Sequence, residues 1–254
     1  MNEENLITYY NKFNEDKRLN TKHGQIEFLT AMKYINNYIK KNDKIIDIGA
    51  GTGRYSKTLS DLGYDVFAVE LVKHNLRQIE EKGIKCIQGN ATNLKKIKDN
   101  EYDITLLFGP MYHLISMEEK EKALMEAKRI TKPGGYIFIS YCTNEYAVIT
   151  HGFIDNNIIE SMNNNLIDKD YKITPKNDDL YSFVRLEDIN HLKDKCNLKR
   201  VKILSQDGPT EYIKKTINKM NEEEFNAYLN YHLSTCERTE LLGAGRHILD
   251  ILQK

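Results

Sequence analysis

The sequence predicts an α/β protein with a doubly wound, mostly parallel seven-stranded sheet. Two observations predict it: short apolar runs alternate with amphipathic stretches between residues 44 and 142, and a glycine-rich turn follows the first run. The chain has 254 residues, 40% of them hydrophobic, which suits one large domain with a full core. We expect residues 1–41 to form an N-terminal helical lid, residues 42–142 a ligand-binding core, and residues 143–254 the rest of the sheet with a C-terminal cap.

The expected elements follow one another along the chain. A helix over 25–40 precedes strands over 44–48, 65–70, 84–88, 102–108 and 136–142, and helices over 54–62, 72–82 and 117–130 connect these strands. Gly63, Gly83 and Gly134 stand where helix C-terminal caps are expected. Later we expect a strand over 182–184, a helix over 186–195, strands over 200–205 and 247–252, and further helix over 209–240. Two insertions that flank the sixth strand are predicted to cap the carboxyl edge of the sheet.

Composition argues against several classes of protein. The 37 basic and 37 acidic residues give a formal net charge of zero. This argues against a protein that binds nucleic acid through the electrostatic field of its net charge. The four cysteines lie far apart without a C-x-x-C pair, so neither a zinc cluster nor a disulfide framework is predicted. No apolar run approaches the roughly 18 residues of a membrane span, and the acidic N-terminus has no apolar leader. We therefore expect a cytoplasmic protein with no membrane partner.

The most informative segment is a buried strand that runs into three alternate glycines, Gly49, Gly51 and Gly53, and then into a helix. Glycines serve where the backbone needs positive φ or a ligand approaches closely, and the helix N-terminus offers N–H groups to an anion. A dinucleotide fingerprint would need glycine at the position of Arg54, and a phosphate loop would need G-K-[ST]; neither is present. Glu70 ends the second strand, where a doubly wound fold places a carboxylate for the two hydroxyls of a ribose.

With these residues, three further segments make the chain resemble the class I S-adenosylmethionine-dependent methyltransferases over about residues 24–142. The segments are Gly89-Asn90-Ala91-Thr92 after the third strand, Phe108-Gly109-Pro110-Met111-Tyr112-His113-Leu114 at the end of the fourth, and Lys132-Pro133-Gly134-Gly135 before the fifth. The resemblance implies a Rossmann-like methyltransferase fold, with S-adenosylmethionine as the cofactor and S-adenosylhomocysteine as the product.

The resemblance also implies roles for single residues. The glycine turn would contact the methionine part of the cofactor, Asp47 would orient the turn or meet the methionine amino group, and Glu70 would bind the ribose. Asn90 replaces the aspartate that usually accepts a hydrogen bond from adenine, and its oxygen can accept that bond without charge assistance. The expected cofactor-binding residues are Asp47, Gly49, Ala50, Gly51, Gly53, Glu70, Leu71, Asn90, Ala91, Thr92 and Phe108, together with Tyr10 and Arg18 from the lid.

Tyr112 and His113 are the candidates for catalysis, because they follow the fourth strand at the edge where the transferred methyl group must lie. Histidine titrates in the range of a general base, but this stretch recurs in similar methyltransferases with different substrates, so His113 is also a candidate pocket-lining residue. We expect in-line transfer to a small-molecule acceptor without a metal, helped by proximity, orientation and exclusion of water. His232, Arg246 and His247 are interpreted as structural or solvated.

Two alternative functions stay open. One is an RNA or protein methyltransferase, although nucleic-acid amino modifiers carry Asn/Asp-Pro-Pro-Tyr/Phe where this chain has Phe108-Gly109-Pro110-Met111, and no basic appendage is evident. The other is a non-catalytic module that keeps the cofactor site, which the glycines and Glu70 also fit. The neutral net charge and the tyrosine-bearing cap leave a homodimer open.

Overall fold

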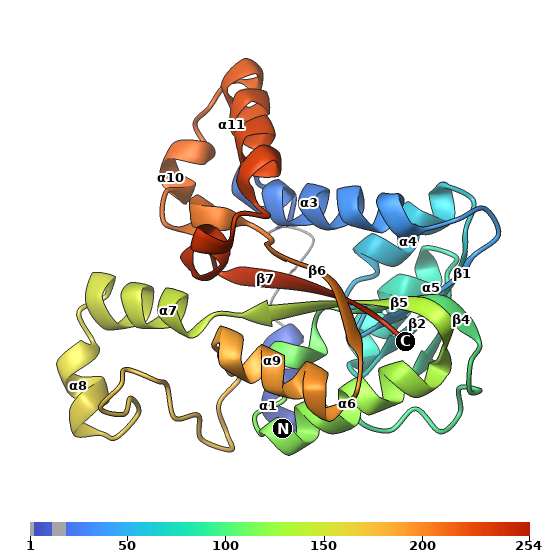
Figure 1. Cartoon of the computed structure of the whole chain (residues 1–254), viewed down its shortest axis with the longest axis horizontal. Helices are drawn as coiled ribbons and strands as arrows, with labels where there is room; N and C mark the ends of the chain where they lie inside the picture. Colours follow the sequence, from blue (N-terminus) through green and yellow to red (C-terminus); the bar gives the residue numbers. More distant parts are fainter. Residues whose placement is uncertain (1–2, 12–18) are drawn as a thin grey trace.

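The computed structural model of the chain describes residues 3–11 and 19–254. The described residues form a seven-stranded sheet with the order β3-β2-β1-β4-β5-β7-β6 (Figure 1). The strands are β1 (Lys44–Ile48), β2 (Asp65–Glu70), β3 (Lys85–Gln88), β4 (Tyr102–Leu107), β5 (Thr131–Cys142), β6 (Lys199–Ser205) and β7 (His247–Gln253). The first five strands pair in parallel, whereas β7 is antiparallel to both β5 and β6. The predicted doubly wound, mostly parallel sheet is therefore confirmed.

Helices cover both faces of this sheet and continue into the two insertions. They are α1 (Glu3–Tyr10), α3 (Lys22–Tyr38), α4 (Arg54–Asp61), α5 (Lys73–Glu81), α6 (Met117–Ile130), α7 (Asn144–Ala147), α8 (Ile158–Asn163), α9 (Leu186–Lys195), α10 (Lys214–Ile217) and α11 (Glu222–Thr235). Helix α6 has the predicted bounds, because a capping box between Ser116 and Glu119 fixes its start. Among the described residues, no helix is both long and apolar enough to cross a membrane.

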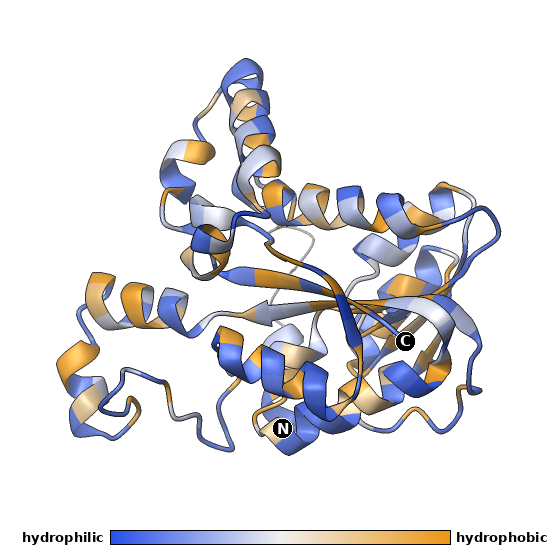
Figure 2. Ribbon diagram, viewed as in Figure 1, coloured by the Kyte–Doolittle hydropathy of each residue, from blue (hydrophilic) through white to orange (hydrophobic). Residues whose placement is uncertain are grey.

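The core lies in two layers, one on each side of the sheet. Successive residues of a strand point to opposite faces. Ile45 belongs to a buried cluster with Ile35 of α3 and Leu59 of α4, whereas its neighbour Ile46 belongs to a cluster with Leu124 of α6. Figure 2 shows the apolar residues gathered in the strands and on the inner sides of these helices. Because helices occupy both faces, the carboxyl edge of the parallel strands is the place left for a ligand.

The two insertions lie at that carboxyl edge. Strand β5 leads directly into α7, and residues 143–185 continue through a π-helical turn (Val148–Ile154) and α8 (Figure 1). Residues 206–246 carry α10 and α11, which contact α3. The insertions therefore occupy the position predicted for the cap.

Two local predictions are wrong. Residues 182–184 form no strand, because Val184 makes only an isolated bridge to Thr143. Gly134 does not cap α6: that helix ends at Ile130 with Thr131 as its C-cap, and Gly134, with φ of +80°, lies within β5 where the register to β4 shifts. The further helix predicted over residues 209–240 is confirmed, in several helices, since Asn221 starts α11 with its own capping box after a break at residues 218–220.

Candidate active site

The glycine turn after β1 forms the floor of the site. Gly49, Gly51 and Gly53 adopt φ values of +69°, +57° and +82°, which side chains with a Cβ rarely tolerate. A Cβ on Gly49 would lie 2.6 Å from Cδ of Pro110, so the turn packs directly against the loop after β4. A Cβ on Gly51 would meet no atom within 4 Å, and Gly51 lines the pocket above the turn. The turn thus combines a close packing contact with an open side for a ligand.

The carboxylate of Glu70 ends β2 beside this turn. Its Oε2 accepts a hydrogen bond from the backbone N–H of Gly51 at 2.8 Å, and its Oε1 accepts one from the N–H of Val72 at 2.9 Å. Burial raises the pKa of Glu70 to about 7, although these two backbone bonds oppose the rise. Glu70 therefore braces the turn and presents a carboxylate to the pocket.

Asp47 lies within β1, two residues before the glycine turn begins. The hydroxyl of Ser56 in α4 donates a hydrogen bond to Oδ2 of Asp47 at 2.6 Å. Burial raises the pKa of Asp47 to about 6, against the lowering effect of this bond. Asp47 therefore fastens β1 to α4 and also lines the pocket.

Most of the predicted site residues line one pocket at the carboxyl edge. From the predicted set, the lining includes Tyr10, Asp47, Gly49, Ala50, Gly51, Glu70, Leu71, Asn90, Ala91, Phe108, Tyr112 and His113. Two others lie beside the pocket: Gly53 is at the start of α4, and Thr92 donates its N–H and its hydroxyl to Oδ1 of Asn90. Arg18 lies outside the described residues.

Asn90 connects helix α1 to the turn after β3. Its Oδ1 accepts the two bonds from Thr92 at 3.0 and 2.9 Å, and its Nδ2 donates to Oε1 of Glu3 in α1 at 2.7 Å. The oxygen expected to accept a bond from adenine is therefore already engaged within its own turn. This gives Asn90 a positioning role that its residue type alone did not indicate.

His113 contacts both α1 and the insertion after β5, each through one ring nitrogen. Nδ1 lies 2.8 Å from the carbonyl oxygen of Leu180, and Nε2 lies 2.8 Å from the hydroxyl of Tyr10. Because a carbonyl can only accept, we assign the proton to Nδ1, and Nε2 then accepts a bond from Tyr10. Burial lowers the pKa of His113 to about 4. A neutral ring with both nitrogens engaged favours the pocket-lining interpretation over the general base.

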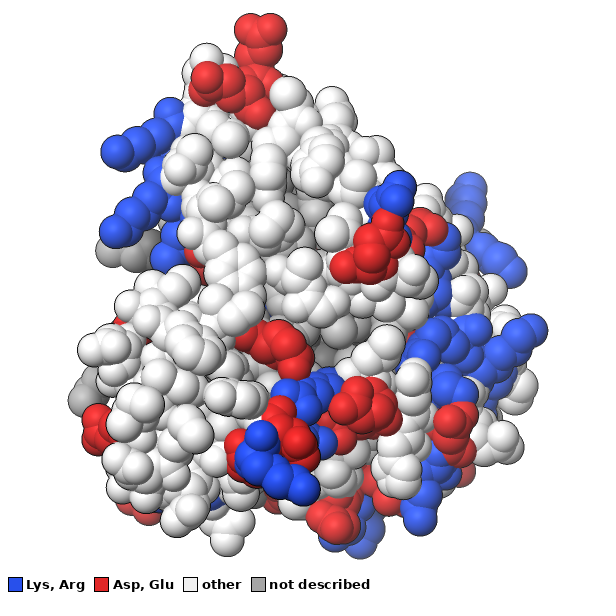
Figure 3. All heavy atoms as spheres, turned by 60° about the vertical axis from the view of Figure 1, so that its left-hand side comes forward, with Lys and Arg blue, Asp and Glu red and all other residues white. Residues whose placement is uncertain are grey.

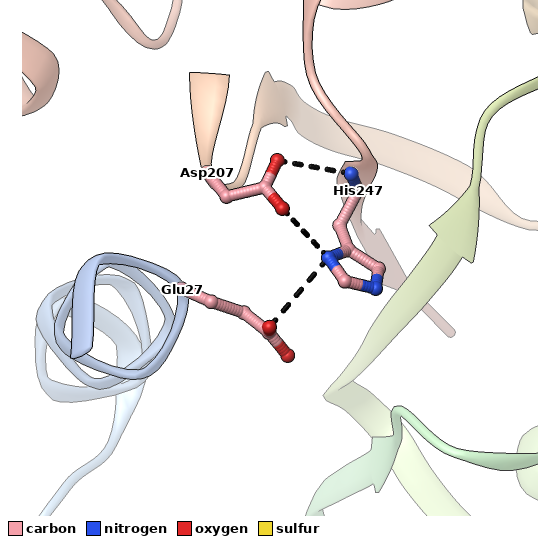
Figure 4. Close-up of side chains that lie close together, drawn as sticks. All are labelled: Glu27, Asp207 and His247. Carbon is pink, nitrogen blue, oxygen red and sulfur yellow. Dashed lines mark hydrogen bonds and ion pairs between the residues drawn. The ribbon is translucent and has the colours of Figure 1, made fainter. Parts of the chain in front are cut away.

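A cluster of ionisable side chains borders the same pocket and was missed by the sequence reasoning. Glu27 of α3 lines the pocket, and near it lie Asp207, which follows β6, and His247, which starts β7 (Figure 4). Nδ1 of His247 lies 2.8 Å from Oδ2 of Asp207 and 3.6 Å from Oε2 of Glu27. Burial opposes protonation of His247, but the two carboxylates outweigh it and raise its pKa well above the usual value. His247 is interpreted from the sequence as structural or solvated, and its exposed fraction of only 2% rules out the solvated alternative.

Comparison with known proteins agrees with this geometry. Residues 46–139 match the family model of a methyltransferase domain. Demethylmenaquinone methyltransferase from Paenarthrobacter aurescens is 38% identical over 107 residues, which span 40% of this chain and 40% of that relative. The chain thus spans less than half the length of the curated relative it matches.

Two solved structures share the fold. S-adenosylmethionine-dependent methyltransferases from Thermotoga maritima and Archaeoglobus fulgidus superpose with TM-scores of 0.61 and 0.58, each at 20% identity. The first comparison covers 98% of this chain and 99% of the other, and the second covers 90% and 94%. The family match falls on the strands and turns that carry the glycines, Glu70 and Phe108. Residues 46–139 therefore match a methyltransferase domain, and the chain shares the fold of the two solved methyltransferases.

Proposed function

We propose that the chain binds S-adenosylmethionine and transfers its methyl group to a small-molecule acceptor, leaving S-adenosylhomocysteine. The observation that carries this proposal is the single pocket into which the glycine turn, the Glu70 carboxylate and the loop after β4 converge. The methyltransferase-domain match over residues 46–139 supports the same reaction.

The pocket residues fit the parts of this cofactor. Each carboxylate oxygen of Glu70 accepts one backbone bond and keeps further lone pairs, so the two oxygens can accept both ribose hydroxyls. The methionine part would lie over the turn at Gly49 and Gly51, with Asp47 as the acidic partner of its amino group. The adenine would lie near Leu71 and Ala91, which line the pocket after β2 and β3.

Transfer would proceed by in-line displacement at the methyl carbon. The acceptor supplies the electron pair of the new bond, and the electrons of the broken C–S bond stay on sulfur as a neutral thioether. The chain contributes chiefly by orienting the cofactor and the acceptor and by excluding water. His113 is neutral and both of its ring nitrogens are hydrogen-bonded, so it supplies no base. Tyr112 and His113 would shape the wall beside the reacting carbon.

A small acceptor suits the surface of the molecule better than a nucleic acid. Among the described residues on the face in Figure 3, basic side chains form small groups interspersed with acidic ones and leave broad uncharged areas. A protein that binds RNA needs an extended basic surface, because contacts to the phosphates supply most of the affinity. The insertions at the carboxyl edge would enclose an acceptor of modest size.

The proposal is tested with S-adenosylmethionine labelled on its methyl group. The protein is incubated with a cell extract that has been separated into metabolites, RNA and protein. We expect label to appear in the metabolite fraction, and Glu70→Ala, which lacks the ribose acceptor, to transfer at most a few per cent as much. Label confined to RNA or protein would contradict the small acceptor, and no transfer despite cofactor binding would indicate a non-catalytic module.

Tyr10→Phe is expected to weaken binding of S-adenosylhomocysteine about fivefold. The substitution removes one neutral hydrogen bond, worth about 1 kcal/mol, that holds α1 against His113. Isothermal titration calorimetry measures the dissociation constant. Tyr9→Phe is the matched control, because the hydroxyl of Tyr9 bonds to Tyr181 instead and Tyr9 is not among the residues that line the pocket. Equal affinities in the wild type and Tyr10→Phe would refute a lid held by this bond.

The affinity for S-adenosylhomocysteine is expected to fall as the pH drops below 7. The pKa of Glu70 in the free protein is about 7, and only the ionised carboxylate can accept both ribose hydroxyls without carrying its own proton. The dissociation constant should be flat above pH 8 and rise toward about tenfold per unit below pH 6.5. Glu70→Gln should remove this dependence, and an unchanged pH profile in that variant would assign the effect to another group.

The raised pKa of Glu70 has the opposite effect on the stability of the free protein, because the free energy of unfolding falls as the pH rises. Because folding raises the pKa of Glu70 from 4.5 to about 7, the protonated form favours the folded state. The contribution of Glu70 to the free energy of unfolding is therefore complete below pH 4.5 and is lost as the pH rises through 7. Glu70→Gln should lack this part of the stability profile as well.

A further inference from the structure

Three potential metal ligands converge at the edge of the cofactor pocket. The carboxylates of Glu27 and Asp207 and the imidazole of His247 each offer one atom, and these atoms lie within 4.8 Å of one another (Figure 4). Nδ1 of His247 lies 2.8 and 3.6 Å from the two carboxylate oxygens. Ligands about 2.1 Å from one tetrahedral ion are roughly 3.4 Å apart, so a small adjustment would admit an ion.

The ligand atoms are held by the fold rather than by flexible loops. The backbone N–H of His247 donates to Oδ1 of Asp207 at 3.0 Å, which fixes that carboxylate and directs Oδ2 toward the imidazole. His247 itself is paired with Cys142 at the start of β7. Such hydrogen bonds behind the ligands are what orients the ligands of a metal site.

The charge of the cluster favours a divalent cation. All three side chains are buried, so a cation bound among them should leave the group without net charge. A divalent ion held by the two carboxylates and a neutral imidazole meets this condition.

We propose that Glu27, Asp207 and His247 form a binding site for a divalent transition-metal ion, Zn²⁺ or Mn²⁺. Imidazole nitrogen suits zinc and its neighbours, and carboxylate oxygen suits manganese, so a set with one nitrogen and two oxygens fits either ion. Calcium would need six to eight oxygen ligands, more than these three residues offer. This site departs from the expectation, drawn from the sequence, of a reaction without a metal.

The position of the site also indicates the class of acceptor. Glu27 lines the cofactor pocket, and the ring of Tyr112 lies 6.0 Å from that of His247. Three protein ligands leave coordination positions open, and a negatively charged oxygen of the acceptor, such as a phenolate or a carboxylate, would occupy one of them. This acceptor class rests on the proposed methyl transfer, whereas the metal site does not.

The metal site is tested by calorimetric titration of the chelator-treated full chain. Zn²⁺, Mn²⁺ and Mg²⁺ are each titrated in a separate experiment. We expect one ion per chain for Zn²⁺ or Mn²⁺, and an increase in the unfolding midpoint of about 5–10 °C at 100 times the dissociation constant. Asp207→Asn and His247→Gln should each weaken binding at least 100-fold. His151→Gln, which changes an exposed histidine of the cap, is the matched control and should bind as the wild type does.

Stabilisation by S-adenosylhomocysteine checks that each variant is folded and keeps the cofactor pocket. If His247→Gln fails to fold, Glu27→Gln, on the separate helix α3, tests the same site. The proposal is overturned if the wild type binds neither Zn²⁺ nor Mn²⁺ at 100 µM, or if the ligand variants bind as tightly as the wild type. Metal binding without any response to S-adenosylhomocysteine would instead contradict the proposed function and leave the metal site standing.

Discussion

Replacing Glu70 by alanine is expected to raise the dissociation constant of S-adenosylhomocysteine at least 100-fold. The carboxylate would accept two ribose hydroxyls, and hydrogen bonds to a charged acceptor contribute about 1.5–3 kcal/mol each. Losing about 3 kcal/mol corresponds to a factor of more than 100 in affinity. The substitution also leaves the N–H groups of Gly51 and Val72 without their acceptor, which loosens the turn that holds the methionine part.

Isothermal titration calorimetry with the wild type, Glu70→Ala and Glu81→Ala measures this effect. Glu81 is an exposed glutamate at the end of α5, so its removal should leave the affinity unchanged. Circular dichroism would verify that each variant is folded. An affinity of Glu70→Ala within threefold of the wild type would remove Glu70 from the ribose site.

Replacing Arg200 by methionine is expected to lower the free energy of unfolding by about 3 kcal/mol. Nε and Nη2 of Arg200 donate to the two oxygens of Asp250 at 2.7 and 2.9 Å, and Asp250 is fully buried between β6 and β5. Removing the guanidinium leaves this carboxylate buried without a partner. For a domain of this size the unfolding midpoint should fall by about 6–12 °C. The affected strands, β6 and β7, position Asp207 and His247.

The pH dependence identifies the cause of that loss. Burial already raises the pKa of Asp250, and without Arg200 it should rise further. The protonated carboxyl then favours the folded state, so the deficit of Arg200→Met should be larger at pH 8 than at pH 5. Lys199→Met, at an exposed position of the same strand, is the control, and the double variant Arg200→Met/Asp250→Leu should recover most of the loss. A deficit independent of pH would point to lost packing instead.

The elements that the sequence could predict are those set by local signals. The bounds of β1 and β2 follow from short apolar runs, and those of α6 follow from Ser116 and an apolar stripe. The link between the glycine turn and Glu70 also follows, because parallel neighbouring strands bring their carboxyl ends to one edge. Most of the predicted pocket lining lies within these units.

The rest depends on contacts between distant parts of the chain. Glu27 and His247 meet because β7 inserts between β5 and β6, an order that apolar periodicity does not encode. The bond between Tyr10 and His113 likewise joins α1 to the loop after β4, and the two residues are 103 positions apart in the sequence. Neither pair has a motif or a spacing that could have indicated it. Tertiary packing, rather than local propensity, decides which side chains face the acceptor.

The most direct measurement is thermal unfolding of the protein alone and with S-adenosylmethionine, S-adenosylhomocysteine or NAD. A ligand at 100 times its dissociation constant adds about 2.7 kcal/mol to the free energy of unfolding, which raises the midpoint of a domain of this size by about 5–10 °C. We predict this increase with both adenosyl ligands and none with NAD. An unchanged midpoint with S-adenosylhomocysteine, or an increase with NAD alone, would contradict the proposed cofactor site.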